Sequence, residues 1–147
     1  MSPEEERQLA VDLFNRAWKL MELEARTPEQ DDELAHTAHA SAYHWLQVGT
    51  AANRARSEWQ CSRVYVTLGR AEPALHHARR CLEISEAAPE ALEDWDLPFA
   101  HEALARAHAL AGDADEAARH LALARELGAR IADAEDREHL EAELATV

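Results

Sequence analysis

Start and stop signals for helices recur along the chain, and they constrain its fold more than any other feature. Ser2-Pro3-Glu4-Glu5 and Thr27-Pro28-Glu29-Gln30 each combine a hydroxyl N-cap, a proline at the first helical position and Glu or Gln at the third. Apolar residues recur every three or four positions, alanine is abundant and β-branched residues are sparse. The sequence therefore predicts an all-α chain.

These signals predict about seven helices in antiparallel pairs. We expect the first helix to run from Pro3 to about Arg26 and the second to begin almost at once and end near Val48, before Gly49. Later helices are expected at about residues 50–68, 72–87, 96–112, 113–128 and 133–145, and the longest loop at 89–98. Short connections make neighbouring helices pack antiparallel.

Two segments of the chain align with an offset of 43 residues. Gly69-Arg70-Ala71 aligns with Gly112-Asp113-Ala114. Before the glycines, Cys61, Ser62 and Tyr65 align with Leu104, Ala105 and His108. After them, Ala74, Ala78 and Cys81 align with Ala117, Leu121 and Ala124. A large residue, a small residue, a tyrosine and a glycine, followed by alanines on the next helix, resemble the tetratricopeptide repeat (TPR).

The resemblance covers about residues 55–88 and 98–131. The chain as a whole resembles short bacterial proteins with TPR-like folds. The resemblance implies a single domain, residues 1–147, built as a superhelical stack of antiparallel helix pairs. Residues 1–53 would form a longer N-terminal hairpin, and 133–147 a C-terminal capping helix. The chain departs from the family at Ala78 and Leu121, where an aromatic residue is usual, and its period exceeds the usual length of about 34 residues.

In TPR-like proteins the first helix of each pair lines a concave groove, so the resemblance implies a protein- or peptide-binding module. The residues predicted to bind the partner are Arg56, Trp59, Arg63, Phe99, Glu102 and Arg106. A tryptophan between two arginines could stack on a side chain and pair with a carboxylate. Alternatively, the arginines pair with acidic neighbours on the chain, as Glu102 and Arg106 would at i,i+4.

Clustered histidines provide an alternative function, that of a metal-binding protein or metal-dependent enzyme. The antiparallel stack is predicted to bring five of them to one end of the layers: His36, His39, His76, His77 and His108. Imidazoles there would bind zinc, iron or copper, with Asp32 or Glu33 as a carboxylate ligand. No HExxH motif is present, and the other interpretation is that these histidines fill amphipathic faces.

Composition excludes several other classes of function. A net charge of −14 disfavours nucleic acids and anionic membranes as partners. The chain has no apolar run of about 18 residues, no glycine-rich phosphate loop and no GxSxG motif, so no catalytic residue is predicted. The acidic start at Glu4–Glu6 is unlike a signal peptide, and Cys61 and Cys81 form no CxxC motif. We expect a cytoplasmic protein, with self-association as an alternative mode of interaction.

Overall fold

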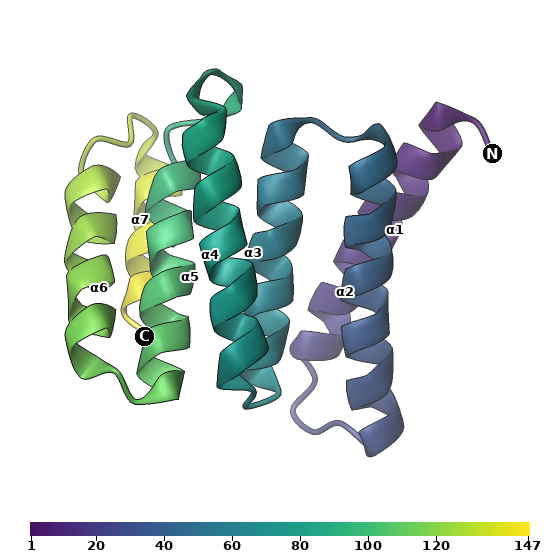
Figure 1. The fold of residues 1–147 in the computed structure, drawn as a ribbon, viewed down its shortest axis with the longest axis horizontal. Helices are drawn as coiled ribbons and strands as arrows, with labels where there is room; N and C mark the ends of the chain where they lie inside the picture. Colours follow the sequence, from purple (N-terminus) through teal and green to yellow (C-terminus); the bar gives the residue numbers. More distant parts are fainter.

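The computed structural model describes residues 1–147, and Figure 1 shows them as a row of packed helix pairs. The seven helices are α1 (Pro3–Met21), α2 (Pro28–Val48), α3 (Ala51–Thr67), α4 (Ala71–Ala87), α5 (Asp96–Ala111), α6 (Ala114–Gly128) and α7 (Ala134–Leu144). A short 3-10 helix, η1 (Pro89–Ala91), precedes α5, and there is no strand. The prediction of an all-α chain with about seven helices is confirmed. None of these helices has the length and apolar character needed to span a membrane.

Side-chain caps fix where the first helices begin. The Ser2 hydroxyl accepts a hydrogen bond from the Glu5 amide, and the Glu5 carboxylate accepts one from the Ser2 amide. Thr27 and Gln30 form the same reciprocal pair at the start of α2. Thr50 caps α3 through the amide of Asn53. Because each cap satisfies amides that lack a partner inside the helix, these starts match the signals in the sequence.

The end of α1 differs from the prediction, because the helix ends at Met21 and not near Arg26. The Arg26 guanidinium turns back toward the end of α1, with 3.4 Å from its Nη1 atom to the carbonyl oxygens of Leu20 and Met21. It also donates to Asp31 at 2.7 Å, at the start of α2. Arg26 thus satisfies carbonyls at the end of α1, and residues 22–27 form a connection where almost none was expected.

The helices pair as α1–α2, α3–α4 and α5–α6, and the pairs lie side by side along the row, with α7 behind α5 in Figure 1. Alanines allow close approach between pairs: Ala74 and Ala78 of α4 pack against Ala103 and Ala107 of α5, all nearly or fully buried. At the C-terminal end, a second cluster that includes Leu140 and Leu144 attaches α7 to the last pair. Small residues therefore allow α4 and α5 to pack closely, and the leucines of α7 pack this helix against the last pair.

The corner between α3 and α4 has the same backbone geometry as the corner between α5 and α6. Gly69 and Gly112 have φ values of 74° and 83°, a region that favours glycine because it has no Cβ. After Gly69, the Arg70 amide donates to the carbonyl of Tyr65 at 2.8 Å, and after Gly112 the Asp113 amide donates to the carbonyl of His108 at 3.0 Å. Residues related by the 43-residue offset therefore occupy equivalent positions at these two corners.

Candidate functional site

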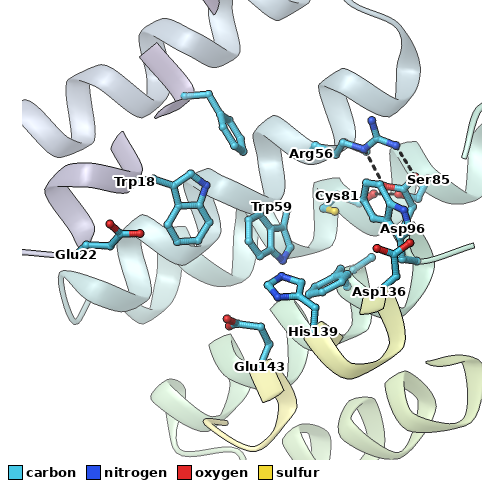
Figure 2. A pocket seen from close by; sticks show the side chains of 15 residues that line it. Trp18, Glu22, Arg56, Trp59, Cys81, Ser85, Asp96, Asp136, His139 and Glu143 are labelled. Atoms are coloured by element: carbon cyan, nitrogen blue, oxygen red, sulfur yellow. Dashed lines mark hydrogen bonds and ion pairs between the residues drawn. The ribbon is translucent and has the colours of Figure 1, made fainter. Parts of the chain in front are cut away.

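A cavity of about 660 Å³ lies between α1, α3, α5 and α7, with α4 at its base (Figure 2). Its walls are mainly aromatic. Three of the four tryptophans and both phenylalanines of the chain line it, namely Phe14, Trp18, Trp59, Trp95 and Phe99. All five side chains are half-buried. A cavity of this size and character is typical of a site that holds a small ligand or a few side chains of a partner.

The aromatic rings support one another across the helices. The ring centroids of Trp18 and Trp59 are 5.6 Å apart, and those of Trp59 and Phe99 are 6.0 Å apart in an edge-on arrangement. Phe99 in turn meets Trp95 edge-on at 6.4 Å. Trp59 is held further because its indole N–H donates to the Glu102 carboxylate at 2.9 Å. The cavity wall is therefore pre-organised by favourable ring contacts before any ligand arrives.

Acidic side chains surround the aromatic wall. Glu22 follows α1, whereas Asp136 and Glu143 lie on α7, and all three line the cavity. Glu143 pairs with Arg63 at 3.0 Å, but neither Glu22 nor Asp136 takes part in an ion pair. The His139 ring of α7 also lines the cavity (Figure 2), and its centroid is 5.4 Å from that of Phe99. The cavity thus joins apolar rings to uncompensated negative charge.

Of the six residues predicted to bind a partner, Arg56, Trp59 and Phe99 line the cavity. Arg56 is already paired, since its guanidinium donates to both carboxylate oxygens of Asp96 at 3.0 and 2.8 Å. The same guanidinium stacks on the Trp95 ring at 4.5 Å from its centroid. Trp95 therefore holds the loop before α5 against α3, as part of the cavity wall.

Arg63, Glu102 and Arg106, the other three predicted residues, form an internal network with α7. Glu102 is fully buried and accepts a hydrogen bond from Arg106 Nε at 2.7 Å. Arg106 also donates to the Glu143 carbonyl at 2.9 Å, and Arg63 donates to the Glu143 carboxylate at 3.0 Å. The pairing of Glu102 with Arg106 that the sequence offered as an alternative is the one that forms. The guanidinium groups of Arg63 and Arg106 thus hold α7 against α3 and α5 and form their hydrogen bonds within the chain.

The five histidines predicted to form one cluster fall into two separate groups. His39 and His77 meet between α2 and α4 with centroids 5.3 Å apart, and His76 is next to His77. Glu58 hydrogen-bonds to His77 at 2.5 Å, and burial, helped by the charge of His77, lowers the pKa of His39. His36 lies one helical turn before His39. His108 belongs to the other corner, so the five do not form one ligand set.

His108 instead meets two residues of α6 that the sequence analysis did not select. Its ring stacks on that of His120, with centroids 5.7 Å apart and an interplanar angle of 4°. His108, Glu116 and His120 each place a ligand atom within 4.8 Å of the other two. A sequence signal for this group exists: Glu116 and His120 are spaced i,i+4 directly after the Gly112 turn, so they share one face of α6.

Both cysteines are buried and free. Burial raises the pKa of Cys61 and of Cys81 to about 12. Cys81 lies at the base of the cavity but is only 4% exposed. Neither thiol is a nucleophile at neutral pH, because the thiolate is the reactive form.

Comparison with known proteins gives no match to a family model, a curated protein or a solved structure. The features of the chain that bear on its function are therefore the cavity and the charges around it.

Proposed function

We propose that this chain is a TPR-like binding module that takes up a segment of a protein or peptide in the cavity between α1, α3, α5 and α7. The observation that carries the proposal is the convergence of both phenylalanines and three of the four tryptophans on one open cavity. Half-buried rings gathered in this way leave apolar surface in water, which is typical of a binding site. Tryptophan is also the residue most enriched where binding energy concentrates.

Two observations support a TPR-like stack as the scaffold. The corners at Gly69 and Gly112 share their backbone geometry, and residues 43 positions apart make equivalent contacts. The cavity is lined mainly by the first helix of each pair, as in the concave groove of TPR-like proteins, and α7 closes its C-terminal end. In this arrangement the ligand contacts several helix pairs at once.

The charges around the cavity favour a ligand that carries positive charge beside an apolar group. The guanidinium groups of Arg56, Arg63 and Arg106 are bonded to carboxylates of the chain, so they add no free positive charge. Glu22 and Asp136 remain available to a ligand. A lysine or arginine beside an apolar side chain would cover the rings and reach these carboxylates. A cation over a tryptophan face contributes about 0.5–2 kcal/mol.

Selection from a random peptide library displayed on phage tests this proposal directly. We expect enriched peptides to combine Lys or Arg with an adjacent apolar residue. Synthetic copies of those peptides should bind Trp18→Ala at least tenfold more weakly, because a central aromatic contact is lost. Tyr43→Ala is the matched control, since Tyr43 is an aromatic residue that is 58% exposed on α2 and outside the cavity.

The electrostatic part of the proposal has its own variants. Glu22→Gln combined with Asp136→Asn should weaken binding of the basic peptides and reduce its dependence on salt. Three results would contradict the proposed function: no enrichment from the library, enrichment of acidic peptides, or equal binding by the wild-type chain and Trp18→Ala.

A further inference from the structure

A second group of functional side chains lies at the corner between α5 and α6, and none of them lines the aromatic cavity. His108 on α5 and Glu116 and His120 on α6 bring three ligand atoms within 4.8 Å of one another. His108 is 8% exposed and His120 6% exposed. We propose that these three side chains form a binding site for a divalent transition-metal ion, with zinc as the ion.

The hydrogen bonds of His120 determine which of its ring nitrogens carries the proton and which offers a lone pair. Its Nε2 atom lies 3.1 Å from Nη2 of Arg119, and a guanidinium can only donate, so Nε2 accepts. The proton of the neutral ring is therefore on Nδ1, which lies 3.0 Å from Nδ1 of His101 and donates to it. Metal-binding histidines commonly have this arrangement, with the second ring nitrogen donating to a fixed acceptor.

The Nε2 atom of His120 lies 3.6 Å from Oε2 of the Glu116 carboxylate. Two imidazoles and one carboxylate are a ligand set that binds zinc and leaves a fourth position for water. The site thus has the donors that zinc requires.

A positive group already lies against these donors. The Arg119 guanidinium donates to both oxygens of Glu116, at 3.2 Å from Nε to each and 2.8 Å from Nη2, as well as to His120. The Arg119 side chain is 57% exposed, so it can turn into solvent. A divalent metal ion would replace the guanidinium at these acceptor atoms, because it carries a higher charge than the guanidinium. Arg119 is therefore expected to compete with the metal.

The equivalent corner of the preceding repeat shows that the fold does not require these ligands. There the ring of Tyr65 stacks on His77 at 5.7 Å and 6°, the same geometry as His108 on His120. The residues 43 positions before His101, His108, Glu116 and His120 are Glu58, Tyr65, Pro73 and His77. A tyrosine thus supports the same packing as His108, and the helix start tolerates a residue other than glutamate.

Zinc titration of tag-free protein after chelator treatment tests the proposal, with calorimetry for affinity and cobalt absorption as a spectroscopic probe. We expect one ion per chain and tenfold or greater weakening in Glu116→Gln and in His108→Tyr. His108→Tyr should keep the fold, because it installs the residue of the equivalent corner. Arg119→Gln should bind zinc several-fold more tightly, because it removes the competing cation.

His76→Ala is the matched control, since His76 is an exposed histidine of the other group. Its zinc affinity should equal that of the wild-type chain. Absence of stoichiometric binding would overturn the proposal, and so would unchanged affinity in His108→Tyr or Glu116→Gln. Loss of binding in Arg119→Gln, or in His76→Ala, would also overturn it. Circular dichroism of each variant separates a lost ligand from a lost fold.

Discussion

Replacement of Glu102 by alanine is expected to destabilise the chain strongly, because the buried carboxylate joins α3 to α5 and pairs with the arginines that bind α7. Glu102 is fully buried and accepts hydrogen bonds from Trp59 at 2.9 Å and from Arg106 at 2.7 Å. Hydrogen bonds to a charged group contribute about 1.5–3 kcal/mol each. The Arg106 side chain, only 10% exposed, would also lose its closest carboxylate.

Breaking a buried ion pair by removing one partner costs about 3–5 kcal/mol. We expect Glu102→Ala to lose about that amount of unfolding free energy, equivalent to a melting temperature about 10 °C lower in a chain of this size. Urea denaturation followed by circular dichroism measures the change. Glu102→Gln should lose less, because the amide oxygen still accepts from the indole of Trp59.

Glu83→Ala is the matched control for this measurement. Glu83 also pairs with an arginine, Arg80, at 2.6 Å, but its side chain is 61% exposed. Its removal should change stability by less than about 1 kcal/mol, and high salt should reduce even that contribution. A loss below about 1 kcal/mol in Glu102→Ala would refute the reasoning, since the network would then not hold α7 in place.

Three further predictions concern the corner glycine, the cysteines and the buried histidine. Gly112→Ala should lose about 1 kcal/mol of unfolding free energy in urea, because φ is 83° while no atom obstructs a Cβ; unchanged stability would contradict this. Cys61 and Cys81, with pKa values of about 12, should resist a thiol reagent in the native chain and react after denaturation; rapid native labelling would contradict their burial. His120, whose pKa falls from 6.5 to about 4, should stay neutral in an NMR titration until the pH approaches 4. Because the unfolded chain then binds more protons, stability should fall as pH drops from about 6.5 to about 4, and His120→Phe should flatten that slope; an equal slope in both would contradict the assignment.

The parts of the fold that depend on local signals could be predicted from the sequence. Caps such as Ser2 with Glu5 involve residues three positions apart, so their pattern in the sequence is enough to find them. The end of α1 could not be predicted in this way. It depends on the Arg26 side chain returning to carbonyls five and six residues earlier and on its contact with Asp31.

The candidate site was only partly predictable for a related reason. Trp59 and Phe99 were found because the resemblance to the repeat assigns them to the groove-lining face of the first helix of each pair. Phe14, Trp18 and Trp95 were not among the predicted binding residues, because their convergence depends on how α1 and the loop before α5 pack against α3. The alignment also could not show that α7 packs over this face and accepts hydrogen bonds from Arg63 of α3 and Arg106 of α5.

The contacts among the histidines could also be predicted only in part from the sequence. Ordering them by height along the stack grouped His108 with His36, His39, His76 and His77, but height does not specify which helix pair a side chain contacts. The stacking partner of His108 is set by its own corner, where α6 returns alongside α5 after Gly112. Applying the 43-residue offset to His77 identifies His120 as its equivalent, so the signal was present in the repeat.

The indole N–H signals of the four tryptophans, followed by NMR during titration with a peptide selected from the library, test the binding function most directly. Trp18, Trp59 and Trp95 line the cavity, whereas Trp45 is buried on α2, with Arg7 over its ring at 5.4 Å. We predict that the three cavity signals shift together with one dissociation constant while the Trp45 signal stays in place. A peptide that binds and shifts Trp45 alone, or none of the four, would contradict the proposed site.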